Sequence, residues 1–84
     1  MIKVTYIGML ATNLKQDEEE VEWSEALTDV ADLIDSLCER RAEVWSRSLR
    51  QKNLLISVNH SMVKADQALS DGDEVILFPP MSGG

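Results

Sequence analysis

Cysteine, histidine and basic residues are scarce in this chain of 84 residues, and so are long apolar runs. The one cysteine, Cys38, cannot form an internal disulfide, so a small disulfide-stabilised scaffold is excluded. The one histidine, His60, has no catalytic companion near it in the sequence. Because the chain also lacks a metal-spaced cluster, a phosphate-binding loop and a catalytic triad, we expect no bound metal and no ATP binding by this chain alone.

The charge balance and the distribution of apolar residues restrict the partners. Fifteen acidic residues against eight basic ones give a net charge of −7, which disfavours nucleic acid and anionic membranes and favours a basic protein partner. No apolar run approaches the roughly 18 residues that a membrane span requires. A strand pattern begins at once in residues 1–7 in place of a signal peptide, so we expect a cytoplasmic protein.

Alternating and continuous apolar patterns predict five strands, at residues 1–7, 20–23, 54–58, 62–64 and 74–78. The first two form a hairpin, and the acidic residues 17–20 are interpreted as a solvated turn between them. The run 54–58 is almost wholly apolar, which predicts the centre of the sheet. Turns are expected at residues 59–61 and at Gly72, where an Asp-Gly step supplies a positive φ.

Helical spacing is clear in one segment. The expected N-cap is Thr28, and the helix should end near Arg40 and Arg41. Between them, four apolar residues are spaced at i, i+3, i+4 and i+7: Val30, Leu33, Ile34 and Leu37. A short second helix over residues 42–50 would place Trp45 at the edge of the core, and Trp23 and Cys38 are also interpreted as packing residues. This order predicts an α+β fold with a mixed sheet and one main helix across one face.

The final seven residues combine a strand end, two prolines and two glycines: Phe78, Pro79, Pro80, Met81, Ser82, Gly83 and Gly84. The prolines lack the N–H that a strand needs, so the strand should stop before them. Glycine has no Cβ and lets the main chain enter a channel too narrow for side chains. We therefore predict one domain over residues 1–78 and an extended, flexible tail over residues 79–84.

This ending, the loop of residues 69–75 and the Val58-Asn59 step resemble the small subunit of molybdopterin synthase. These MoaD-like sulfur carriers have a ubiquitin-like β-grasp fold, and the resemblance covers essentially the whole chain. The most specific part of the resemblance is the C-terminal ending, which in the family consists of Phe-Pro-Pro, two variable residues and Gly-Gly. The segment 6–12 departs from the family because it lacks the Arg-Glu pair that many members carry after the first strand.

The resemblance implies that the chain is a sulfur carrier for molybdenum cofactor biosynthesis and not an enzyme on its own. An E1-like activating enzyme would use ATP to adenylate the carboxylate of Gly84, and a sulfur donor protein would convert the adenylate to a thiocarboxylate. The tail would then enter the large subunit of molybdopterin synthase, in a heterotetramer, and give its sulfur to a cyclic pyranopterin precursor. Residues 78–83 would contact the partners, with Phe78 as an aromatic anchor or, equally, an ordinary core residue.

Three other functions remain open at this point. A ubiquitin-like protein modifier would use the same activated Gly84 to form isopeptide bonds with lysines. A carrier for another small-molecule pathway, such as thiamine synthesis, would share the thiocarboxylate, although carriers of that pathway are usually shorter. A passive binding module would have a tail that is never activated.

Overall fold

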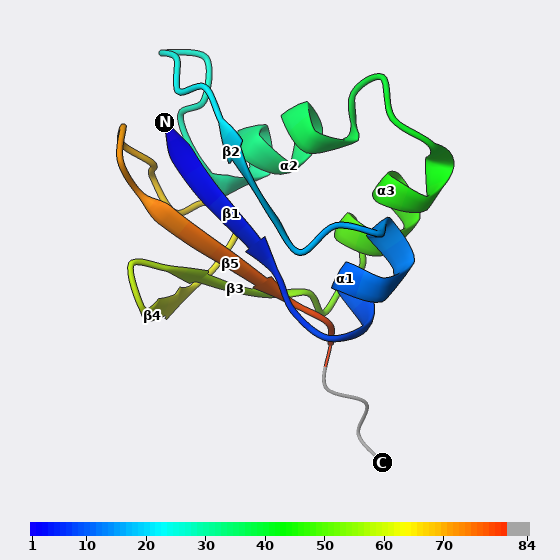
Figure 1. Cartoon of the computed structure of the whole chain (residues 1–84). Coiled ribbons are helices and arrows are strands. Elements are labelled where there is room, and N and C mark those ends of the chain that lie inside the picture. Colours follow the sequence, from blue (N-terminus) through cyan, green and yellow to red (C-terminus); the bar gives the residue numbers. More distant parts are fainter. Residues whose placement is uncertain (81–84) are drawn as a thin grey trace.

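The computed structural model describes residues 1–80, which form a five-stranded mixed sheet with three helices packed on one of its faces (Figure 1). The strands are β1 (Ile2–Tyr6), β2 (Glu18–Val21), β3 (Leu55–Val58), β4 (Ser61–Val63) and β5 (Glu74–Phe78). The helices are α1 (Met9–Leu14), α2 (Val30–Cys38) and α3 (Glu43–Leu49). The predicted α+β class is confirmed, and all five predicted strands and both predicted helices are present.

The sheet has the strand order β2-β1-β5-β3-β4. β1 runs parallel to β5 and antiparallel to β2, while β3 is antiparallel to both β5 and β4. This order, with the main helix across one face, is the ubiquitin-like β-grasp arrangement. The prediction that residues 54–58 form the central strand is wrong, because β5 occupies the centre. A continuous apolar run indicates that a strand is buried on both faces, but it does not indicate the position of the strand in the sheet. β3 is buried at Ile56, Ser57 and Val58, although it is not the middle strand.

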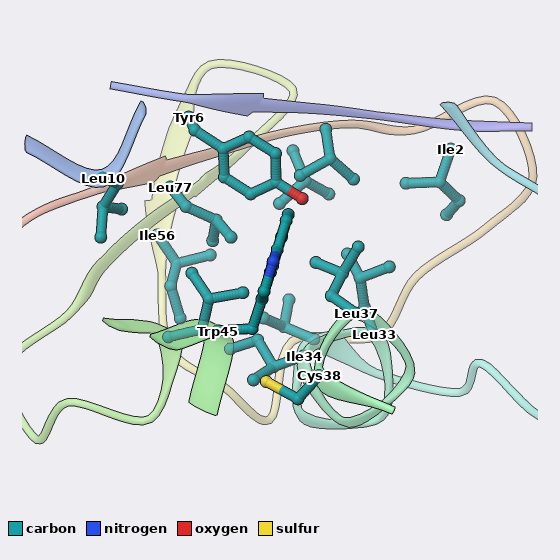
Figure 2. Packing of buried hydrophobic residues seen from close by; sticks show 14 of the residues in the cluster. Ile2, Tyr6, Leu10, Leu33, Ile34, Leu37, Cys38, Trp45, Ile56 and Leu77 are labelled. Carbon is teal, nitrogen blue, oxygen red and sulfur yellow. The ribbon is translucent and has the colours of Figure 1, made fainter. Parts of the chain in front are cut away.

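The core lies between the sheet and the helices (Figure 2). β1 contributes the alternate residues Ile2, Val4 and Tyr6, and α2 contributes the four apolar residues that helical spacing predicted. Leu33 and Leu37 are at most 1% exposed, and burying a side chain of this size stabilises the fold by about 1.5–3 kcal/mol. The predicted packing roles are confirmed for Cys38 and Trp45, which are buried, and for Trp23, which packs against the core from its margin.

Both ends of α2 differ from the prediction. Its N-cap is Asp29, whose side chain accepts a hydrogen bond from the Asp32 N–H at 2.9 Å. Thr28 instead donates its hydroxyl and its N–H to the Asp32 carboxylate, at 2.5 and 3.0 Å. The helix ends at Cys38 because the C-cap Glu39 has an extended conformation, with a φ of −64° and a ψ of 131°. Arg40 follows with a φ of 59°, which is also not helical.

The segment after β1 contains a helix that the sequence pattern did not predict. α1 is only six residues long and buries Leu10 and Leu14, which are one helical turn apart. Lys15, with a φ of 56°, ends it in the left-handed conformation. Two apolar residues at i and i+4 are too few to distinguish a short helix from a loop by periodicity.

The acidic segment is also different from the prediction, since Glu18, Glu19 and Glu20 are strand residues of β2 and not a turn. They pair with Thr5, Val4 and Lys3 of β1. Glu19 is stabilised in this position by hydrogen bonds from Arg41 and from the Tyr6 hydroxyl. Glu19 is the residue of this acidic run that faces inward, and its charge is balanced by Arg41. The run can therefore form a strand, although its composition disfavours one.

The predicted turns are confirmed. Asn59 and His60 have φ values of 49° and 71°, so β3 and β4 are joined by a two-residue loop with both central residues left-handed, as in a type I′ turn. Gly72 has a φ of 93°, the positive value expected for the Asp-Gly step. β4 is an edge strand of the sheet.

Candidate functional site

The base of the tail is the C-terminal end of β5, the strand at the centre of the sheet. Tyr6 of β1 pairs with Leu77, and Leu55 of β3 pairs with Phe78, so both sides of the strand are occupied up to its last residue. The Ile7 N–H continues the ladder by donating to the Leu77 carbonyl at 3.1 Å. Figure 1 shows β5 leaving the sheet beside α1. The neighbouring strands therefore fix the position from which Pro79 and Pro80 depart.

Gly8 adjoins this base and connects β1 to α1. Its φ of 58° and ψ of −129° lie in a region that is essentially restricted to glycine. A Cβ at this position would lie 3.6 Å from Cγ of Pro79, an ordinary van der Waals contact, so space permits a side chain but the backbone conformation does not. Gly8 thus allows the chain to turn sharply where the first proline of the tail packs.

Five apolar side chains gather on the sheet face opposite the helices, and we call them the open-face patch: Ile7, Leu55, Met62, Ile76 and Phe78. In β5, Val75 and Leu77 face the core, so Ile76 and Phe78 face outward. The other three are placed on the same face by the strand register and its continuation past Tyr6. The tail therefore leaves the domain next to an apolar surface.

The exposure of this patch points to a protein partner. Ile7 is 38% exposed and Met62 is 60% exposed, while Phe78, Ile76 and Leu55 are half-buried. Contiguous apolar surface of this kind is typical of an interaction site. Phe78 lies on the outer face and not in the core cluster, so it is not an ordinary core residue, and its role as an anchor stays a prediction.

The titratable groups with shifted pKa values lie elsewhere. Hydrogen bonds from Arg41 hold the pKa of Glu19 below its usual range, and burial, followed by the bond to Glu19, raises the pKa of Tyr6. Arg41 also stacks on Trp45, so this cluster joins the sheet to the helices and has a structural role. Within residues 1–80, no shifted acid or base lies at Phe78, Pro79 or Pro80. The described part of the site therefore consists of apolar residues, which can bind and position a partner.

The predicted site residues fall into two groups. Phe78, Pro79 and Pro80 lie together at the end of β5. The other four lie outside the described residues: Met81, Ser82, Gly83 and Gly84. The sequence interpretation did not identify the rest of the open-face patch or Gly8. A signal was present in the strand alternation, which puts Ile76 and Phe78 on the same face and opposite Leu77.

Other candidate chemistry is weak in the described residues. Cys38 is buried in the core, and His60 is an exposed turn residue whose imidazole lies 3.7 Å from Glu74. Residues 1–80 contain no group of three metal-ligating side chains. No helix in that range has the length and apolar character needed to cross a membrane.

Residues 4–84 match the ThiS family. The chain belongs to the ThiS family. It is 32% identical to the molybdopterin synthase sulfur carrier subunit of Escherichia coli, over 100% of both chains. Among solved structures, a putative molybdopterin converting factor subunit 1 from Pyrococcus furiosus is 32% identical with a TM-score of 0.75, covering 95% of this chain and 97% of the other.

A complex of subunits 1 and 2 of molybdopterin-converting factor from Helicobacter pylori contains a chain with the same fold. That chain is 24% identical, with a TM-score of 0.66, and the match covers 99% of this chain and 97% of that one. The family match and the two relatives at 32% identity confirm the predicted resemblance to molybdopterin synthase small subunits. The Helicobacter pylori chain adds support for the fold alone.

Proposed function

We propose that this chain is the sulfur carrier subunit of a molybdopterin synthase and that Gly84 carries the sulfur as a thiocarboxylate. The observation that supports this most directly is the full-length similarity to the Escherichia coli sulfur carrier subunit, at 32% identity. The sequence itself adds the Phe-Pro-Pro and Gly-Gly steps, and the fold adds an apolar face beside the tail base.

The chemistry begins with a carboxylate, which is a poor electrophile. In our proposal the Gly84 carboxylate attacks the α-phosphorus of ATP on an E1-like enzyme, releasing pyrophosphate and forming an acyl-adenylate. The terminal sulfur of a donor persulfide then attacks the carbonyl carbon, and AMP leaves with the electron pair of the broken bond. A thiol cleaves the resulting acyl disulfide, forming a new disulfide and leaving the Gly84 thiocarboxylate. ATP is therefore used by the activating enzyme and is not bound by this chain alone.

Two parts of the chain have separate tasks in this proposal. Residues 1–78 are the domain that partners recognise, and residues 79–84 are the tail that enters their active sites. Phe78 is the anchor, since an aromatic ring on an open face is typical of an interface hot spot. Pro79 and Pro80 stiffen the start of the tail, because their rings fix φ.

The last four residues complete the tail. Met81 and Ser82 offer main-chain hydrogen bonds to a groove in the partner, a common form of extended-peptide recognition. Gly83 keeps the approach to the reacting group narrow, because glycine has no side chain.

The proposed partners act in sequence. The E1-like enzyme and the sulfur donor load the carrier, and the large synthase subunit receives it and transfers the sulfur to the cyclic pyranopterin precursor. The Helicobacter pylori complex of subunits 1 and 2 supports a large-subunit partner. The chain itself acts as a non-catalytic subunit, and we place these reactions in the cytoplasm, with a heterotetramer as the expected assembly.

Reconstitution tests this function. The chain, loaded with sulfur, is combined with a molybdopterin synthase large subunit and the pyranopterin precursor, and the dithiolene product is measured. Two matched variants, one lacking Gly84 and one extended by an alanine after it, should form no product while keeping the melting temperature of the wild type. Product formation by either variant would contradict the role of Gly84. A covalent adduct with partner lysines in place of product would favour a protein modifier.

A further inference from the structure

A groove of about 750 Å³ opens at the β4 edge of the molecule, between the sheet and the helices. Its apolar lining comes from both layers and includes Ile34, Leu49, Leu54, Ile56 and Val63. Of these, Leu49 is 1% exposed and belongs to the core cluster, so the groove reaches down to the core. An apolar cleft that remains open at one margin of a two-layer fold has room for an additional segment of chain.

The charge around this groove is opposite to that of the protein. Three of the eight basic residues line it, against one of the fifteen acidic residues. The acid, Asp35, is already paired with Arg50 at 2.8 Å. Within residues 1–80, Lys52 and Lys64 have no acidic side chain within 4.0 Å. In a chain of net charge −7, the groove is thus a locally positive region that attracts negatively charged groups.

The free edge of β4 gives the groove a second recognition element. Val58 and Ser61 close a two-residue hairpin loop and form a hydrogen-bonded pair, so the next pair, Ser57 and Met62, is of the non-hydrogen-bonded type. The N–H and C=O of Met62 therefore point away from β3, toward the open edge. Groups of this kind on an edge strand pair readily with an added strand.

We propose that this groove binds a short extended segment of a partner protein in which acidic residues alternate with aliphatic ones. Its main chain pairs with the edge of β4, its aliphatic side chains enter the groove, and its carboxylates lie near Lys52 and Lys64. A helix fits less well because its main chain is already hydrogen-bonded and would leave the edge of β4 unpaired. This interaction does not involve Gly84 and is independent of the sulfur-carrier function.

A second copy of this chain is the less suitable occupant. If the second copy used its acidic strand β2, the one apolar side chain that this strand could place in the groove is Val21. The Val21 side chain already packs against the core of the copy to which it belongs. Glu19 of the same strand is occupied by Arg41 and Tyr6. Two copies of net charge −7 also repel each other.

The test uses the full chain and a fluorescein-labelled eight-residue peptide that alternates valine with glutamate, whose binding is followed by fluorescence anisotropy. We expect saturable binding that weakens as salt is added, with amide shifts in an HSQC spectrum at Ile34, Leu49 and Val63. The double variant Lys52→Glu/Lys64→Glu should bind about tenfold more weakly. The matched control Lys15→Glu changes an exposed lysine that does not line the groove and should bind like the wild type.

Two further peptides separate the proposal from its alternatives. A peptide with lysine in place of glutamate, and a peptide N-methylated at alternate positions, should each lose most of the binding. Equal binding of the lysine peptide would overturn the charge argument, and equal binding of the methylated peptide would overturn the strand pairing. Amide shifts confined to the open-face patch at Ile7 and Phe78, or concentration-dependent dimers in sedimentation, would overturn the assignment of this groove and its occupant.

Discussion

The guanidinium carbon of Arg41 lies 4.1 Å from the centre of the Trp45 ring. The same guanidinium donates two hydrogen bonds to the Glu19 carboxylate, at 2.7 and 2.8 Å. Glu19 also accepts the Tyr6 hydroxyl at 2.7 Å, and the Tyr6 ring packs edge-on against Trp45, as Figure 2 shows for the two rings. One arginine thus connects β2, β1 and α3 around the margin of the core.

Replacing Arg41 with alanine should lower the free energy of unfolding by about 1–2 kcal/mol, because the half-buried Glu19 carboxylate would lose its cationic partner. Urea denaturation followed by tryptophan fluorescence measures this change. Arg47→Ala is the matched control, since its pair with Glu43 is highly exposed and contributes little. Equal losses for the two variants would show that the cluster around Arg41 has no special role.

Acid should weaken this cluster in a defined pH window. Because the folded-state pKa of Glu19 is lowered, its contribution is complete above the unfolded-state value of about 4.3 and is lost as the pH falls through the folded-state pKa. The difference in unfolding free energy between the wild type and Glu19→Gln should therefore be constant near neutral pH and shrink below about pH 4. Asp32, whose pKa is also lowered, is present in both proteins and cancels in this difference. A difference that stays constant down to pH 3 would contradict the assignment.

Gly8 should not tolerate a side chain, because its backbone conformation disfavours one even though space is available. Gly8→Ala is expected to lower the free energy of unfolding by about 1–2 kcal/mol. Thr12→Ala, on the exposed face of the adjoining α1, should leave stability almost unchanged. Thermal and urea denaturation compare the two, and a neutral Gly8→Ala would show that the turn can relax.

Phe78→Ala should weaken binding to the large synthase subunit more than it weakens the fold. Loss of a hot-spot aromatic typically costs about 2 kcal/mol, which corresponds to about a 30-fold higher Kd. The matched control is Lys3→Ala, which changes an exposed residue on the same sheet face at the far end of β1. Titration calorimetry gives the Kd values, and unchanged affinity for Phe78→Ala would refute the anchor.

Much of the fold was accessible from the sequence because its signals are local. The alternation in β1 and β5, the helical spacing from Val30 to Leu37 and the Asp-Gly step each specify their own structure. The errors arose where a distant contact decides the outcome. Glu18, Glu19 and Glu20 form a strand because Arg41 reaches Glu19 from 22 residues away, which composition does not reveal.

The candidate site was predicted only in part for the same reason. Phe78, Pro79 and Pro80 are contiguous in the sequence and could be identified as a motif. The open-face patch could not, because Ile7 and Met62 join it through the pairing of four strands whose register depends on the whole sheet. The groove beside β4 likewise depends on how far the helices extend over the sheet.

The most direct test of the central claim is the intact mass of the chain after incubation with an E1-like enzyme, ATP and a sulfur donor. A chain lacking Gly84 is the control. We predict a mass gain equal to the exchange of one oxygen for one sulfur in the full chain and no gain in the control. An unchanged mass, or the same gain in the chain without Gly84, would contradict the claim that this residue carries the sulfur.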